Sequence, residues 1–294
     1  MIHLNGVVTS MLTPFTDSYK LDDETLAQEL EYQLSQGIHG ICLLGGTGES
    51  LSLTFEERLR AVEVASQVIK GQVPLVIGSF VPVEDEIVSF GCRIEELGAT
   101  ALMITPPPFY KHTQRQFGKL LERISQRCGI PLIIYNAPAR VAVNLGADAI
   151  AGYIEKHDNI IGVKDATGSI AEVIRMGHAF GRTRSLLQGL DDGFLPSLAS
   201  GATGGLLAFA SPMPELFVDI YESWQRGDNA HALERQMSII PVMKAVSLEP
   251  MPVLVKEAMK VVGRPLGPTR PPLYAPDASN VKALRSAMEK LLEG

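Results

Sequence analysis

Short apolar segments alternate with longer amphipathic segments along most of the chain. Eight segments rich in β-branched residues lie at positions 6–10, 38–44, 74–78, 101–105, 131–135, 160–164, 185–189 and 204–208. Most of them are apolar throughout rather than at every second position, which is typical of parallel strands covered on both faces. The pattern therefore predicts eight parallel strands.

The segments between these strands carry helical patterns. Leu26, Leu30 and Leu34 form one apolar stripe, and Thr54 followed by Glu57 predicts a capping box at a helix start. Further helices are predicted at residues 58–69, 87–97, 117–128, 147–157 and 170–180. We expect glycines at the helix C-termini, namely Gly37, Gly98, Gly129 and Gly181.

Eight strands that alternate with helices predict an α/β fold, a (β/α)8 TIM barrel with a C-terminal helical appendix. The alternative is an open, doubly wound sheet. The tail predicts helices at residues 215–226, 229–246, 252–262 and 279–292, the first of which would complete the barrel. We expect a catalytic barrel over residues 1–225 and a helical extension over residues 226–294.

Composition narrows the class of protein. The 26 basic and 33 acidic residues give a net charge of −7, so neither a nucleic acid nor an anionic membrane is an expected partner. Three cysteines without a CxxC pair fit the cytoplasm, and six scattered histidines suggest no metal site. The chain starts without a signal-peptide pattern and contains no apolar run of the roughly 20 residues that a membrane helix needs.

The residue that ends the sixth apolar segment is a lysine, Lys164. At the mouth of an apolar barrel, desolvation favours the neutral amine over the ammonium, and a neutral amine attacks a ketone carbonyl. The alternative is a surface lysine paired with Asp165. Cys42, inside the second segment, is interpreted as a core residue.

Two further candidates follow the fifth segment. Tyr135 ends it, and its phenol could move the protons that carbinolamine formation requires. Arg140 lies a short loop beyond and could bind a second carboxylate with two hydrogen bonds. A packed aromatic residue and a solvated loop arginine are the respective alternatives.

A glycine-rich turn, Gly45-Gly46-Thr47-Gly48, follows the second segment. Its backbone N–H groups and the threonine hydroxyl could bind a carboxylate, although a simple tight turn is the alternative. The turn is neither a Walker loop nor a dinucleotide fingerprint.

These motifs together resemble the dihydrodipicolinate synthase/N-acetylneuraminate lyase family. The similarity extends from about Gly6 to Pro214 and is carried by GGTGES at 45–50, Tyr-Asn-x-Pro at 135–138 and GVKDATG at 162–168. It implies a lyase in which Lys164 forms a Schiff base with pyruvate or another 2-oxo acid. It also implies that Tyr135 is the acid/base and Thr47 the carboxylate site, and that no metal or nucleotide cofactor takes part.

The resemblance implies further roles. Leu206 matches the position whose backbone carbonyl lines the site. Tyr110 matches a tyrosine that reaches in from a neighbouring subunit, and family members are usually homotetramers, built as dimers of dimers. Arg140 matches the arginine that synthases use for the carboxylate of aspartate semialdehyde.

One position departs from the synthase pattern. Synthases carry a threonine where this chain has Gly46, and that hydroxyl links their two tyrosines. Gly-Gly-Thr-Gly-Glu is closer to some sugar-acid dehydratases. An aldolase or dehydratase of 2-keto-3-deoxy sugar acids or 4-hydroxy-2-oxo acids is therefore an alternative. A more remote one is a non-catalytic ligand-binding barrel in which Lys164 is a bystander.

Overall fold

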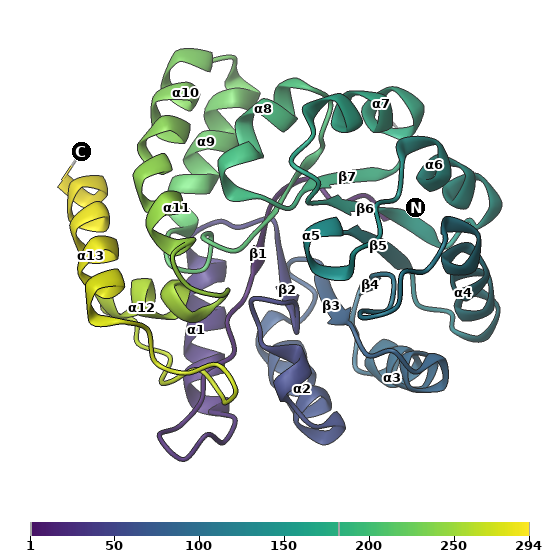
Figure 1. The fold of residues 1–294 in the computed structure, drawn as a ribbon, viewed down its shortest axis with the longest axis horizontal. Coiled ribbons are helices and arrows are strands. Elements are labelled where there is room, and N and C mark those ends of the chain that lie inside the picture. The colour runs from purple at the N-terminus through teal and green to yellow at the C-terminus, as the bar shows by residue number, and fades with distance from the viewer. Residues whose placement is uncertain (1, 182, 294) are drawn as a thin grey trace.

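A computed structural model describes residues 2–181 and 183–293, and its strands close into a barrel (Figure 1). The strands are β1 (Gly6–Ser10), β2 (Gly40–Leu43), β3 (Leu75–Ser79), β4 (Ala101–Ile104), β5 (Leu132–Asn136), β6 (Ile160–Asp165), β7 (Ser185–Gln188) and β8 (Gly204–Leu207). Each strand pairs in parallel with the next, and β8 pairs with β1. The predicted (β/α)8 barrel is confirmed, and the open sheet is excluded. The predicted bounds of 1–225 and 226–294 include Met1 and Gly294, which lie outside the described residues.

Helices surround the barrel (Figure 1). They are α1 (Asp23–Ser35), α2 (Phe55–Ile69), α3 (Glu84–Glu96), α4 (Gln114–Arg127), α5 (Pro138–Val141), α6 (Ala147–Lys156), α7 (Ile170–Phe180), α8 (Phe194–Ala199) and α9 (Pro214–Arg226). Two 3₁₀ turns, η1 (Ser50–Ser52) and η2 (Asp191–Gly193), lie in the loops after β2 and β7. In the described part of the chain, no helix combines the length and the apolar character needed to cross a membrane.

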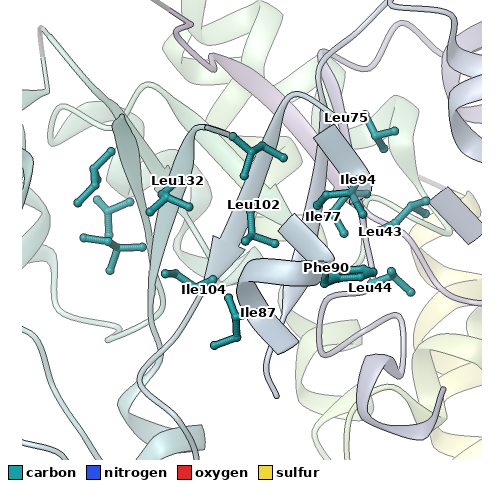
Figure 2. Close-up of a cluster of buried hydrophobic side chains, with 14 of the residues drawn as sticks. Leu43, Leu44, Leu75, Ile77, Ile87, Phe90, Ile94, Leu102, Ile104 and Leu132 are labelled. Atoms are coloured by element: carbon teal, nitrogen blue, oxygen red, sulfur yellow. The ribbon is translucent and has the colours of Figure 1, made fainter. Parts of the chain in front are cut away.

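The core has two layers, because strand side chains point alternately into the barrel and out toward the helices. The interior is filled by apolar residues such as Val8, Cys42 and Met103, so the expectation that Cys42 is a core residue is confirmed. The outward-facing residues pack against helices. Figure 2 shows this layer, with Ile77 and Leu102 of the strands facing α3.

The helix-end predictions are partly confirmed. Thr54 accepts a hydrogen bond from the Glu57 backbone N–H while the Glu57 carboxylate accepts one from the Thr54 N–H, which is the predicted capping box. Gly37 and Gly98 have left-handed φ values of 75° and 89° after α1 and α3. Gly181 is the C-cap residue of α7, as predicted, with a right-handed φ of −59°. Gly129 lies one residue beyond Cys128, the C-cap of α4.

The tail forms α10 (Asn229–Ser238), α11 (Ile240–Val246), α12 (Val253–Val261) and α13 (Ala278–Glu293). The first of them packs against α9, and α13 packs against α11 and α12 (Figure 1). The single helix predicted over residues 229–246 is wrong. Pro241 lacks an N–H and cannot sit in a helix interior, so the chain ends α10 and starts α11 just before it. Apolar residues of these helices share one buried cluster with α8 and α9.

Candidate active site

One cavity of about 460 Å³ opens where the barrel strands end at their carboxyl termini. Barrels of this type have their active sites at this face. Five residues singled out from the sequence line the cavity together: Gly46, Thr47, Tyr135, Arg140 and Lys164. The fold thus brings the ends of β2, β5 and β6 to one place.

Lys164 is buried in this cavity. Its side chain extends from β6, the residue is 7% exposed, and its Nζ lies 4.5 Å from the centre of the Tyr135 ring. The alternative of a surface lysine paired with Asp165 does not hold. The Asp165 carboxylate instead accepts hydrogen bonds from Asn136 Nδ2 at 3.1 Å and from Thr167 Oγ1 at 2.7 Å.

An irregular pairing of β5 with β6 sets the direction of the lysine. Ile133 lies opposite Gly162 rather than Ile161, so β6 contains one extra residue. Beyond that shift, Tyr135 lies opposite Lys164. Such a β-bulge changes the face toward which the following side chains point. Both side chains consequently face the cavity at the end of the barrel.

Behind the cavity, a buried polar network joins β5, β6 and the loop that carries α5. Asn136 Nδ2 donates to Asp165 Oδ1 and to the Leu145 carbonyl at 3.0 Å, and its Oδ1 accepts from the Leu145 N–H. Burial raises the pKa of Asp165, against the lowering effect of hydrogen bonds from Thr167 and Asn136. The network fixes the strand ends from which Tyr135 and Lys164 project.

The glycine-rich turn after β2 forms another wall. Thr47 is 6% exposed. A Cβ atom at Gly46 would meet no other atom within 4 Å, whereas one at Gly48 would lie 3.1 Å from the Leu44 backbone nitrogen. The turn therefore has open space beside Gly46.

The remaining candidates lie farther from the lysine. Arg140 is exposed on α5 and lines the cavity. Tyr110 is 69% exposed, packs edge-on against Phe109 at 5.2 Å, and does not line the cavity. Leu206 is fully buried inside the barrel, and it is Ala208, just beyond the end of β8, that lines the cavity.

The arrangement suits carbonyl chemistry. A buried amine can add to a carbonyl, and a neighbouring phenol can carry the protons that enter and leave. Across residues 2–181 and 183–293, no group of three or more His, Cys, Asp or Glu side chains could hold a metal ion.

Comparison with known proteins identifies the family. The model of the dihydrodipicolinate synthetase family matches residues 3–291. The chain belongs to this family. The 4-hydroxy-tetrahydrodipicolinate synthase of Methanopyrus kandleri is 32% identical over 289 residues, which cover 98% of this chain and 96% of that protein. The corresponding enzyme of Methanocaldococcus jannaschii is 30% identical over 97% of this chain and 98% of its own.

A solved structure of a dihydrodipicolinate synthase from Thermotoga maritima superposes with a TM-score of 0.94 at 26% identity, covering 99% of each chain. Members of the dihydrodipicolinate synthetase family thus share the whole fold described above, including the helical tail.

Two lining residues with chemistry of their own, Asp191 and Met251, were not among the predicted site residues. Asp191 is 9% exposed, and its Oδ1 accepts a hydrogen bond from the Phe209 N–H at 2.8 Å. Burial raises its pKa to about 6, although that hydrogen bond and the charge of Lys164 lower it. The sequence feature that could have indicated Asp191 is the acidic pair Asp191-Asp192, which follows the seventh apolar segment. Met251 reaches the cavity from the tail, and no local pattern indicated it.

Proposed function

We propose that this chain is a lyase that holds pyruvate, or another 2-oxo acid, as a Schiff base on Lys164. The observation that supports it most is the buried amine of Lys164 at the floor of an apolar cavity, level with Tyr135 on the neighbouring strand. Addition of the amine to the C2 carbonyl and loss of water give an imine. Its protonated form accepts the electron pair released when a proton or a carbon substituent leaves C3, which gives a neutral enamine.

The walls of the cavity supply the other roles. Tyr135 donates and accepts the protons of carbinolamine formation and of the later carbon–carbon step. Backbone N–H groups around Gly46, with the Thr47 hydroxyl, bind the substrate carboxylate. At the end of β8 the wall of the cavity is supplied by Ala208 rather than by the predicted Leu206. No metal or organic cofactor is needed, because the lysine itself provides the electron sink.

The second substrate is an aldehyde with a distal carboxylate, such as aspartate semialdehyde, bound by Arg140 at the mouth. The names of the relatives from Methanopyrus kandleri and Methanocaldococcus jannaschii support this synthase reaction. One observation favours the aldolase or dehydratase of a sugar acid instead. The open space beside Gly46 leaves room for a longer, hydroxylated substrate. Glycine at this position also lacks the side-chain hydroxyl that links two tyrosines in synthases.

We further propose that the protein is a homotetramer, built as a dimer of dimers, in the cytoplasm. Phe109 is 92% exposed, Tyr110 is 69% exposed, and Leu51 at the cavity mouth is 65% exposed, which supports burial of this rim by a second copy. In that arrangement Tyr110 enters the cavity of the neighbouring subunit. Residues 1–225 then form the catalytic barrel and residues 226–294 an extension to it.

Borohydride reduction in the presence of pyruvate tests the proposal. The expected result is a covalent adduct that peptide mapping places on Lys164, and loss of both adduct and turnover in Lys164→Ala with an unchanged circular dichroism spectrum. Parallel assays with aspartate semialdehyde and with 2-keto-3-deoxy sugar acids separate the two reactions. A wild-type protein that forms no adduct with any 2-oxo acid would favour the non-catalytic barrel and refute the proposal.

A further inference from the structure

The turn that lines the cavity after β2 has a strained backbone. Leu44, just before it, has φ of 58°, and Glu49, near its end, has φ of 51°. Side chains other than glycine rarely adopt this left-handed region, and they persist there only where surrounding contacts hold them. Gly46 and Thr47 lie between these two residues, so the contacts of Glu49 determine where the carboxylate-binding backbone lies.

The C-terminal extension supplies those contacts. The Glu49 side chain is fully buried, and its Oε1 accepts a hydrogen bond from Lys256 Nζ of α12 at 2.9 Å. Its Oε2 accepts one from the backbone N–H of Arg270 at 2.8 Å. Lys256 is itself 2% exposed and also donates to the Pro268 carbonyl at 2.6 Å. Both carboxylate oxygens are therefore held by residues that follow Glu49 by more than 200 positions.

The same segment is joined to the barrel at a second place beside the turn. Arg270 Nη1 donates to the Ser52 carbonyl and to the Glu57 carboxylate, both at 2.7 Å. The guanidinium of Arg270 and the ammonium of Lys256 lie over the Phe15 ring at 4.3 Å and 4.4 Å from its centre. Lys256 and Arg270 therefore connect the C-terminal extension to the turn through Glu49 and to the start of α2 through Glu57.

We propose that Lys256 and Glu49 are positioning residues that keep Gly46 and Thr47 in the geometry that binds the 2-oxo acid carboxylate. This inference rests on the proposed function. It assigns a role in substrate binding to the extension, which also contributes Met251 to the cavity wall. Because a buried carboxylate left without its cation must be hydrated or protonated, loss of Lys256 moves the turn. Lys256 does not contact the substrate, and Lys164 keeps its own surroundings.

The experiment titrates adduct formation with pyruvate and borohydride in full-length Lys256→Met. Methionine keeps an unbranched side chain that is one atom shorter, and it removes the charged ammonium. We expect the pyruvate concentration for half-maximal trapping to rise on the order of tenfold, because displaced binding groups weaken binding steeply. Trapping at saturating pyruvate is expected to stay complete. Lys260→Met is the matched control, since Lys260 lies one turn further along α12, half-exposed, and pairs with Glu257.

A second variant keeps the test informative if Lys256→Met does not fold. Glu49→Gln keeps the shape and an acceptor for Arg270 while removing the charge that Lys256 neutralises, and we expect it to fold with a several-fold higher half-saturating concentration. A folded Lys256→Met or Glu49→Gln protein with the half-saturating concentration of the wild type would overturn the positioning role alone. Absence of any adduct in the wild type would overturn the proposed function, and this inference with it.

Discussion

The Asp191 carboxyl group is ionised at neutral pH although it is buried, and burial disfavours the charged form. The carboxyl group is buried beside the cavity, accepts one hydrogen bond from the Phe209 N–H, and has no cation within 4 Å in residues 2–181 and 183–293. Burial raises its pKa from 3.8 to about 6. We therefore predict that Asp191→Asn makes the protein more stable at neutral pH, because the amide keeps the acceptor oxygen and removes the buried charge.

The size and sign of the effect of Asp191 follow from proton linkage. Between pH 3.8 and about 6 the folded protein keeps a proton on Asp191 that the unfolded chain has lost, so the free energy of unfolding falls as the pH rises. Above that window the penalty is constant, about 3 kcal/mol for a shift of about two pH units. The new amide N–H₂ group needs a hydrogen-bond acceptor, and burying it without one costs about 1 kcal/mol or more of that gain. The net gain at pH 7.5 is then about 1–2 kcal/mol.

Urea unfolding of wild type and variant at pH 7.5 and pH 4, at one protein concentration, measures the difference. The gain of Asp191→Asn should be present at pH 7.5 and absent or reversed at pH 4. The matched control is Asp192→Asn, because Asp192 is exposed next to it and should show little change at either pH. Equal stability of Asp191→Asn and wild type at pH 7.5, or the same gain at both pH values, would refute the reasoning. A stabilised variant with reduced turnover would show that the buried charge is retained for function.

Four other substitutions test the site and the barrel. Tyr135→Phe should slow turnover by roughly 10²–10⁴-fold if the phenol moves protons, and an unchanged rate would remove it from that role. Arg140→Ala should raise KM for the second substrate much more than for pyruvate, and steady-state kinetics showing equal effects would argue against its placement. Gly46→Thr should leave the melting temperature within a few degrees of the wild type, because its Cβ meets nothing within 4 Å; a poorly folded product would contradict this. Gly162→Ala should lower the melting temperature strongly, because its Cβ would lie 2.3 Å from the Ser185 carbonyl oxygen, and a wild-type melting temperature would show that the strands can separate there.

The fold could be predicted because its signals are local. The first strand and α7 have the predicted bounds, since each is a continuous run of one pattern between clear turn residues. The candidates at strand ends meet in one cavity because parallel strands of a barrel all end at the same face. The short helix α8 was not predicted individually, because its six residues include Pro196 and are too few to show a helical period.

Contacts between distant segments could not be predicted in the same way. The local sequence shows Glu49 only as part of a glycine-rich turn. It shows Lys256 only as one lysine of a predicted helix. Their pairing depends on how the extension packs against the barrel, which neither local pattern contains. Tyr110 is a different case. Tyr110 is exposed in the single chain, and its proposed role requires contacts with a second copy that the pattern of one chain cannot contain.

The direction of the Lys164 side chain could not be predicted from the sequence of its strand. When both faces of a strand are buried, its sequence does not reveal which residues point inward. A regular pairing would place Lys164 opposite Asn136 and turn its amine outward, whereas the extra residue at Ile161 places it opposite Tyr135. Gly162 permits the close approach to β7 just beyond that bulge, because any side chain there would clash with it. The extra residue at Ile161 and the glycine that follows it therefore place the lysine of the GVKD motif in the cavity.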